Sequence, residues 1–252
     1  MIHTATRDRV LRIEIARPDK KNALTQEMYR AMSQALAAAD ADAQVRAILI
    51  HGARDCFTAG NDLKDFLERP PHAGPADSFQ FISTLPKVGK PLIAAVGGVA
   101  VGVGTTMLLH CDLVYATPSA RFQMPFVPLG LVPEAASSLL LPMIAGYQRA
   151  AELLLLGQPF GAEKALAAGF VTEIVPEERL LEHAAAAAAA VAALPPASVR
   201  LTKQLMKRQL ATAIGAQMAE EGRIFAERLQ SSEAKEAMTA FFEKRKPDFS
   251  RF

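Results

Sequence analysis

One acidic residue stands alone in a long apolar stretch of this 252-residue chain. Glu134 follows Phe122-Gln-Met-Pro-Phe-Val-Pro-Leu-Gly-Leu-Val-Pro133 and precedes Ala-Ala-Ser-Ser138, at the predicted start of a helix. A carboxylate in such surroundings is partly desolvated, which raises its pKa and suits it to move a proton. The stretch holds no second carboxylate, which favours a reaction with one base. The alternative is that Glu134 only complements the positive end of the helix dipole.

Two glycine-containing segments each lie between a predicted strand and a predicted helix. They are Phe57-Thr-Ala-Gly-Asn-Asp-Leu63 and Gly97-Gly-Val-Ala-Val-Gly-Val-Gly104. Each can present backbone N–H groups at a helix start, where the dipole adds positive potential. Two converging N–H groups form an oxyanion hole, in which one donor is typically worth about 3–4 kcal/mol. The alternative interpretations of these segments are dinucleotide binding or a plain tight turn. Neither segment matches the G-x-G-x-x-G or P-loop pattern.

The hydrophobic patterns predict alternating strands and helices, followed by a helical second half. Strands are predicted over residues 9–16, 45–51, 92–96 and 112–116, and helices over 25–41 and 103–110, with Thr25 as an N-cap. Residues 57–62 are predicted as a loop, followed by a short helix through residue 67 and a surface segment over 69–75. After Pro133 the chain is nearly all helix, including 198–210, 217–229 and 232–244. This order predicts an α/β fold with right-handed crossovers.

Composition excludes several classes of protein. The chain has 28 basic and 26 acidic residues, and its net charge of +2 does not indicate a nucleic-acid-binding protein. Two cysteines fit a reducing compartment, and five histidines form no metal-binding pair, so we expect a cytoplasmic protein without a metal. No signal peptide is evident at the start of the sequence. The uncharged residues 92–109 have the length of a membrane span, but glycines within them favour a buried strand, loop and helix.

Five segments, in the expected order along nearly the whole chain, resemble the crotonase, or enoyl-CoA hydratase/isomerase, superfamily. They are Arg17-Pro-Asp-Lys-Lys-Asn-Ala-Leu24, Phe57-Thr-Ala-Gly-Asn-Asp-Leu63, Ala94-Ala-Val-Gly-Gly-Val-Ala-Val-Gly-Val-Gly104, Cys111-Asp-Leu-Val-Tyr-Ala116 and Ala162-Glu-Lys-Ala-Leu-Ala-Ala-Gly-Phe-Val-Thr-Glu173. The resemblance implies a spiral of ββα repeats that binds acyl-CoA over residues 1–195. It also implies a helical region over 196–252 that mediates trimerisation, giving a homotrimer or a dimer of trimers.

The resemblance also implies roles for individual residues. The thioester oxygen would be held by the backbone N–H groups of Asn61 and Val103, the latter replacing the usual glycine with a side chain that narrows the pocket. The residues expected to bind the substrate are Lys20, Ala59, Asp62, Leu63, Lys64, Gly102, Thr106, Phe126 and Leu129. Lys20 and Lys64 are the candidates for the CoA phosphates. No separate cofactor is expected, since coenzyme A is part of the substrate.

The hydratases of this superfamily use two glutamates, and this chain has Thr106 and Phe126 at those positions. The segment around Glu134 instead resembles monofunctional Δ3,Δ2-enoyl-CoA isomerases, whose single base follows a proline; Ala135 and Ala136 depart from their more common glycines. Glu134 would carry a proton from C2 to C4 of a 3-enoyl-CoA through a dienolate. The alternatives are an enoyl-CoA hydratase, a thioester hydrolase or another crotonase-type enzyme, and a non-catalytic scaffold or RNA-binding member.

Overall fold

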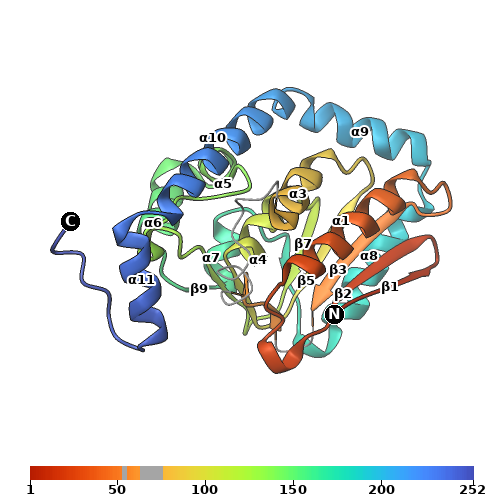
Figure 1. The fold of residues 1–252 in the computed structure, drawn as a ribbon. Helices are drawn as coiled ribbons and strands as arrows, with labels where there is room; N and C mark the ends of the chain where they lie inside the picture. Colours follow the sequence, from red (N-terminus) through yellow and green to blue (C-terminus); the bar gives the residue numbers. More distant parts are fainter. Residues whose placement is uncertain (53–55, 63–75) are drawn as a thin grey trace.

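The computed structural model describes residues 1–52, 56–62 and 76–252 (Figure 1). The predicted short helix through residue 67 and the predicted surface segment 69–75 lie outside these ranges. The first half of the described chain contains β1 (Ile2–Arg7), β2 (Val10–Ile15), η1 (Pro18–Lys20), α1 (Gln26–Ala41), β3 (Ala47–Gly52), β4 (Cys56–Thr58), α3 (Asp77–Thr84), η3 (Leu85–Lys87), β5 (Leu92–Val96), β6 (Val99–Val101), α4 (Val103–Thr106), η4 (Met107–His110), β7 (Leu113–Ala116) and β8 (Arg121–Gln123).

The second half is mainly helical, as the sequence predicts. It contains η5 (Val127–Leu129), α5 (Ser137–Ala145), α6 (Tyr147–Leu156), β9 (Phe160–Gly161), α7 (Ala162–Ala167), β10 (Glu173–Ile174), η6 (Glu177–Arg179), α8 (Leu180–Ala193), α9 (Pro196–Arg208), α10 (Ala211–Leu229) and α11 (Ser232–Phe242).

The larger of the two sheets among the described residues has the strand order β1-β2-β3-β5-β7-β10. Apart from the β1–β2 hairpin its strands are parallel, and β3 and β5 are buried along almost their whole length. Such continuous apolar strands need cover on both faces. Along β3 the side chains alternate: Ile48 and Ile50 join the core that contains α1, whereas Ala47 and Leu49 pack with α8. Figure 1 shows α1 and α8 on the two sides of this sheet.

The predicted elements of this sheet are confirmed to within a few residues. The strand over 92–96 is found as β5 with the same bounds, and the helix over 25–41 is found as α1. Thr25 is its N-cap, because the Thr25 side chain accepts a hydrogen bond from the N–H of Met28 at 3.3 Å. The predicted helix over 103–110 consists of α4, one turn long, followed by the tighter turn η4.

A second sheet, with the order β4-β6-β8-β9, was not predicted from the sequence. The prediction of a loop over 57–62 is wrong at its start, since residues 57 and 58 belong to β4. The glycine-rich segment likewise contains β6. These strands have only two or three residues each, too few for an alternating pattern to show. Their pairing sets the two glycine-containing segments side by side, through the parallel register of β4 and β6.

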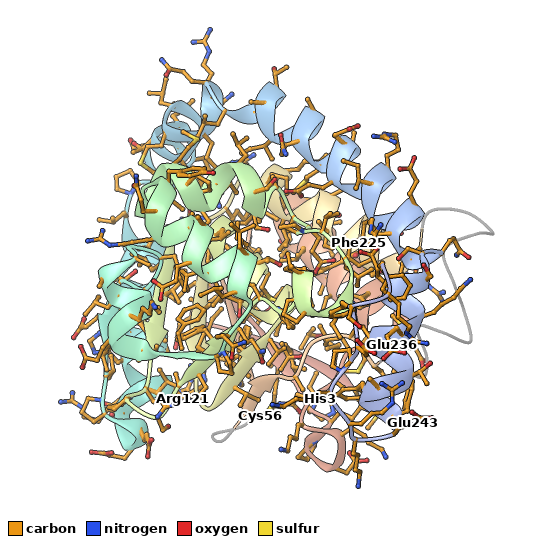
Figure 2. All side chains as sticks on the ribbon, turned by 90° about the vertical axis from the view of Figure 1, so that its left-hand side faces the viewer. His3, Cys56, Arg121, Phe225, Glu236 and Glu243 are labelled. Carbon is orange, nitrogen blue, oxygen red and sulfur yellow. The ribbon has the colours of Figure 1, made fainter. Side chains whose placement is uncertain are left out.

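The last three helices leave the body of the protein and form an arch across it (Figure 1). The helix α9 begins two residues and α10 six residues before the predicted starts, and α9 and α11 each end two residues before the predicted ends. Phe225 of α10 points into the interior, whereas Glu243 just after α11 lies at the edge of the molecule (Figure 2). Large apolar side chains stay exposed on these helices, among them Leu201, Leu205 and Phe242.

Within the described ranges, no single helix combines the length and the hydropathy of a membrane span, although η6 with α8 and then α9, bent by 107°, pass that test as a pair. The uncharged residues 92–109 are divided among β5, β6, α4 and η4, as predicted from their glycines.

A buried ion pair anchors α9 to the larger sheet. Lys203 is 4% exposed, and its Nζ donates to Asp112 Oδ2 at 2.6 Å and to the Lys90 carbonyl at 2.7 Å. Asp112 Oδ2 also accepts the N–H of Leu92 at 2.7 Å, at the start of β5. This pair therefore ties the helical arch to the strand that leads into the glycine-rich segment.

We predict that Lys203→Met lowers the free energy of unfolding by about 2 kcal/mol, because it leaves the Asp112 carboxylate without its close cation. The loss stays below that of a fully buried pair, since Lys207 Nζ lies 3.9 Å from Asp112 Oδ1. Urea unfolding measures it, with Lys235→Met, an exposed lysine on α11, as the control. Equal stability of the two variants would contradict the anchor.

Candidate active site

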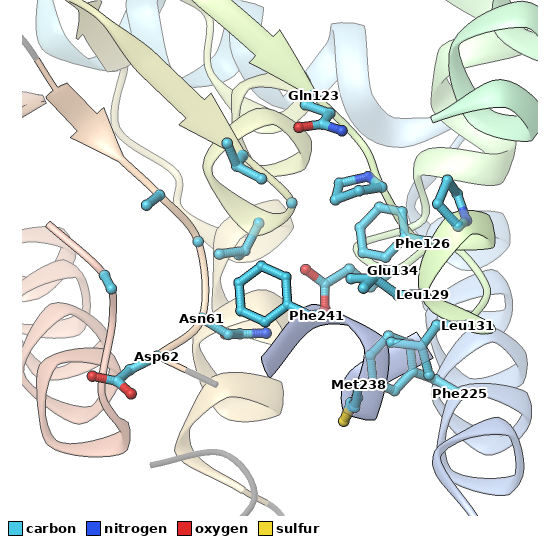
Figure 3. A pocket seen from close by; sticks show the side chains of 18 of the residues that line it. Asn61, Asp62, Gln123, Phe126, Leu129, Leu131, Glu134, Phe225, Met238 and Phe241 are labelled. Carbon is cyan, nitrogen blue, oxygen red and sulfur yellow. The ribbon is translucent and has the colours of Figure 1, made fainter. Parts of the chain in front are cut away.

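A pocket of about 620 Å³ lies where the two glycine-containing segments face the chain around Glu134 (Figure 3). Its walls include Asn61, Val103 and Glu134, which the sequence predicts to be the reacting set. Phe225, Met238, Phe241 and Phe242 complete it from α10 and α11. Most of the remaining wall is apolar.

Glu134 is buried in this wall with one carboxylate oxygen unpaired. The residue is 8% exposed, and its Oε1 has no hydrogen-bond partner among the described residues. Burial, with a smaller contribution from the negative charge of Glu221, raises the pKa of Glu134 from 4.5 to about 8. A carboxyl group whose pKa lies close to neutral pH can take up a proton in one step and release it in the next.

The local sequence places Glu134 on a sharply folded turn rather than in the helix. The structure corrects the predicted helix start at this residue, because α5 begins at Ser137, three positions later. Between them, Ala135 and Ala136 have φ angles of 61° and 54°, in the left-handed region that residues other than glycine rarely adopt. The first-turn N–H of Ser138 donates to Glu221. Glu134 therefore lies before α5 rather than in its first turn.

The two predicted oxyanion-hole donors lie just after the adjacent short strands β4 and β6. Leu24 pairs with the Asn61 segment through the bonds Leu24 N–H to Gly60 O and Asp62 N–H to Leu24 O. In such a parallel bridge the N–H of Asn61 itself points away from Leu24. Val103 is the first residue of α4, so its N–H has no carbonyl to pair with inside the helix.

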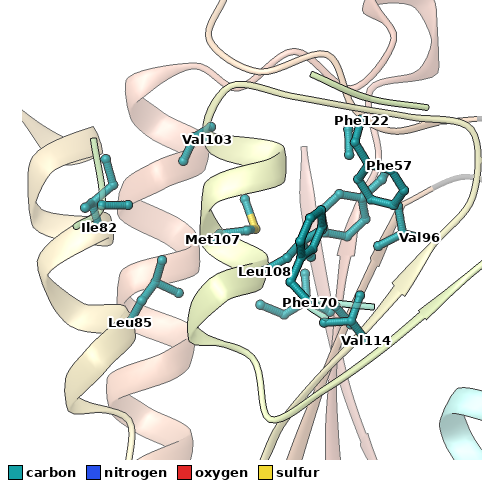
Figure 4. Close-up of a cluster of buried hydrophobic side chains, with 14 of the residues drawn as sticks. Phe57, Ile82, Leu85, Val96, Val103, Met107, Leu108, Val114, Phe122 and Phe170 are labelled. Atoms are coloured by element: carbon teal, nitrogen blue, oxygen red, sulfur yellow. The ribbon is translucent and has the colours of Figure 1, made fainter. Parts of the chain in front are cut away.

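Glycines allow these two segments to approach closely. A Cβ on Gly104 would lie 2.6 Å from the Thr58 side chain, and one on Gly60 would lie 2.7 Å from the Val101 carbonyl oxygen. Gly60 and Gly102 also have positive φ angles, of 86° and 56°. The Val103 side chain turns into the core near Met107 and Ile82 (Figure 4), where it is 1% exposed.

Hydrogen bonds from two neighbouring elements fix the Asn61 segment. The buried Tyr29 hydroxyl of α1 donates to Asn61 Oδ1. Arg17 Nη1 donates to Asp62 Oδ2 at 2.7 Å and to the Ala23 carbonyl at 3.0 Å. Burial, reinforced by the charge of Glu134, raises the pKa of Tyr29, so the hydroxyl stays protonated and remains a donor.

Most of the residues predicted to bind the substrate lie around this pocket. The walls contain Lys20, Ala59, Asp62, Gly102, Phe126 and Leu129. Thr106 is fully buried in α4, outside the residues that line the pocket, with its Oγ1 unpaired among the described residues. Leu63 and Lys64 lie outside the described residues. Within those residues, no group of three His, Cys, Asp or Glu side chains is placed to hold a metal ion.

A second cavity, of about 700 Å³, lies beside the first and shares Glu134 with it. It extends between α3, α9 and α10, and its walls include Ile82, Ile214 and Met218. Sequence reasoning missed Tyr29, Glu221 and Phe225, which the fold brings to the site from α1 and α10. In the sequence each of them looks like an ordinary residue of a predicted helix, so no local signal marked it.

The comparisons with known proteins agree on one family. The family model described as enoyl-CoA hydratase/isomerase matches residues 5–251. The chain is 36% identical to the enoyl-CoA delta isomerase 2 of Rattus norvegicus. The match covers 92% of this chain but only about 61% of the length of that relative. It is 33% identical to the 2,3-dehydroadipyl-CoA hydratase of Escherichia coli, covering 96% of this chain and 95% of that one. A crystal structure of an enoyl-CoA hydratase/isomerase from Pseudoalteromonas atlantica superposes with a TM-score of 0.95 at 45% identity, covering 99% of both chains.

Gly104→Ala is expected to destabilise the protein by about 2 kcal/mol, because the added methyl meets Thr58 and forces the two segments apart. The same shift moves the Val103 N–H, so turnover should fall along with stability. Gly215→Ala in α10 is the matched control, since nothing lies within 4 Å of its added Cβ. Denaturant unfolding of both variants tests this, and a Gly104→Ala protein as stable as Gly215→Ala would refute the close packing.

Glu134→Gln is predicted to become more stable than the wild type as the pH rises. The folded wild type keeps Glu134 protonated up to a pKa of about 8, whereas the unfolded chain releases this proton near 4.5. Wild-type stability therefore falls through this window, by up to about 1.4 kcal/mol per pH unit from this group. Unfolding curves of both proteins from pH 5 to 8 measure the difference, and a constant difference would contradict the raised pKa.

Proposed function

The chain belongs to the enoyl-CoA hydratase/isomerase family, and on that premise we propose that it converts a 3-enoyl-CoA into the conjugated 2-enoyl-CoA. The observation that carries the proposal is Glu134, a buried carboxylate in the pocket wall with an unpaired oxygen. The other carboxylate of that wall, Asp62, is bound to Arg17. Glu134 is thus the group in the described wall that is suited to take up a proton.

The reaction needs one base and one oxyanion site. The Glu134 carboxylate removes a proton from C2, and the electron pair moves onto the thioester oxygen while the C3–C4 double bond is retained, giving a dienolate. The N–H groups of Asn61 and Val103 hold the negative oxygen. The dienolate then takes the same proton from Glu134 at C4, the double bond comes to lie between C2 and C3, and Glu134 is again a carboxylate. No water enters the balance.

The surroundings of Glu134 support a reaction without water. Phe126 is 5% exposed and Leu131 is 8% exposed, and both line the pocket beside Glu134 (Figure 3). In the resembled hydratases two glutamates position the attacking water, and the corresponding residues here are Thr106 and Phe126. Neither of these side chains can accept a proton from water.

The two cavities that meet at Glu134 support a path for the substrate. We propose that the CoA portion lies in the first cavity, between Lys20 and Asp62, with the thioester at Asn61 and Val103. The acyl chain then passes Glu134 and enters the second, mainly apolar cavity. This places C2 and C4 on the two sides of one carboxylate, as a single proton carrier requires.

The alternative is an enoyl-CoA hydratase or another crotonase-type enzyme such as a thioester hydrolase. The 33% identity to a dehydroadipyl-CoA hydratase keeps hydration as the second candidate. The fold also brings a second buried carboxylate, Glu221, near Glu134. Both oxygens of Glu221 already accept hydrogen bonds from the chain after Glu134, which argues against its orienting a water molecule.

We further propose that the protein acts in the cytoplasm as a homotrimer or a dimer of trimers. Exposed apolar side chains on α9 and α11, such as Leu205 and Phe241, support association with further copies. We also propose a division into a ββα core over 1–195 and a helical region over 196–252, placed at the start of α9 at Pro196.

The test of the proposed reaction is an assay of purified protein on 3-hexenoyl-CoA, with products separated by chromatography. We predict conjugated 2-hexenoyl-CoA from the wild type and a loss of about 10³-fold in kcat for Glu134→Gln. Glu163→Gln, an exposed glutamate on α7, serves as the control and should react like the wild type. Formation of 3-hydroxyacyl-CoA from a 2-enoyl-CoA, without isomerisation, would establish the hydratase instead, and release of free CoA thiol would indicate a hydrolase.

A further inference from the structure

The turn that carries Glu134 has a backbone conformation that needs outside support. Ala135 and Ala136 are consecutive residues other than glycine with left-handed φ angles. These residues are 2% and 0% exposed, so the turn is buried rather than free at the surface. A shift of this turn would move the Glu134 carboxylate, because the two are adjacent in the chain.

Two buried side chains from distant parts of the sequence bind the backbone of this turn. One accepts hydrogen bonds from its N–H groups, and the other donates to one of its carbonyl groups. Glu221 of α10 accepts the N–H of Ala136 with Oε2 at 2.6 Å and the N–H of Ser138 with Oε1 at 3.1 Å. The hydroxyl of Ser138 also donates to Glu221 Oε1. His110 of η4, 2% exposed, has its Nε2 2.8 Å from the carbonyl oxygen of Ala135 and donates to it.

We infer that Glu221 is a positioning residue that fixes the Glu134 carboxylate between the two cavities by binding the Ala135–Ala136 turn. An ionised carboxylate is the group that can accept all three donors at once, since an amide in its place would present an NH₂ to at least one of them. Glu221 is 5% exposed, so it has little contact with bulk water that could replace these donors. The inference rests on the proposed role of Glu134 as the base.

The charge of Glu221 has a second effect on the same residue. The two carboxylates border the second cavity, and the negative charge of Glu221 adds to burial in raising the pKa of Glu134. In the part of the chain that the structure describes, the other titratable side chains that face Glu134, the turn or this cavity are Tyr29 of α1, Lys87 of η3, His110 of η4 and Lys207 of α9. Burial keeps Tyr29 and His110 neutral: it raises the pKa of Tyr29 and lowers the pKa of His110 to about 4. Lys207 Nζ donates to the His110 carbonyl at 3.1 Å, and burial lowers the pKa of Lys207.

The experiment compares Glu221→Gln with the matched control Glu220→Gln. Glu220 is the preceding residue on α10, but it is exposed and paired with Arg223. The first readout is the titration midpoint of the Glu134 carboxyl, taken from infrared difference spectra against the same protein with Glu134→Gln. This readout needs no substrate. The second is kcat and KM on 3-hexenoyl-CoA.

For Glu221→Gln we expect the Glu134 midpoint to fall by about one pH unit, because a like charge has been removed. We also expect kcat to fall about tenfold or more while KM changes less than about twofold, since the base is displaced but the CoA contacts remain. Glu220→Gln should match the wild type in all three. A Glu221→Gln protein with the wild-type midpoint and the wild-type kcat would overturn the inference.

If Glu221→Gln does not fold, Glu221→Asp carries the test, because it keeps the charge but shortens the reach to the turn. The inference then requires a midpoint close to that of the wild type together with a reduced kcat. An unchanged kcat would overturn it. A wild-type protein that does not isomerise 3-hexenoyl-CoA would contradict the proposed function, whereas the infrared titration would still decide whether Glu221 controls Glu134.

Discussion

The site depends on one constraint, which is that the Glu134 carboxylate is buried with no cation or hydrogen-bond donor at its Oε1 among the described residues. Taking an ionised carboxyl group out of water is costly, and most proteins offset that cost with a cation or with several hydrogen-bond donors. Here Glu134 has neither at Oε1, and its pKa rises to about 8 instead. The negative charge of Glu221 adds to the effect of burial and raises the pKa of Glu134 further. The result is a carboxyl group that holds its proton more tightly than an ordinary glutamate, as the proposed base must.

The rest of the fold supplies what this carboxylate lacks. The close approach of Gly60 and Gly104 to the opposite segments brings two backbone donors to one edge of the pocket, opposite Glu134. The left-handed turn after Glu134 costs roughly 1–2 kcal/mol for each alanine, and its buried partners on η4 and α10 offset that cost. The turn at the site thus lowers the stability of the protein, whereas the sheet and its covering helices contribute stability. That distribution is common where activity depends on a strained or desolvated group.

The sequence predicted the parts of the structure that depend on local pattern. The buried run of β5, the apolar face and N-cap of α1 and the lone carboxylate Glu134 can all be seen in a short window of residues. The second sheet could not be predicted, because the three residues of β6 contain too little pattern and pair only with distant strands. Tyr29 and Glu221 were not predicted to belong to the site for a related reason. Each looks like an ordinary helix residue in the sequence, and only the fold brings it to the pocket. The start of α5 was misplaced because Ala135 and Ala136 adopt a conformation that alanine rarely shows.

The central claim is that one buried carboxylate carries the same proton from C2 to C4. The most direct measurement is the reaction of 3-hexenoyl-CoA deuterated at C2, run in ordinary water, with mass and NMR analysis of the 2-enoyl product. The account predicts that deuterium removed from C2 appears at C4 in a large part of the product, because Glu134 is shielded from solvent between the two transfers. A product with protium alone at C4 would contradict it, since the proton would then come from water or from a second acid.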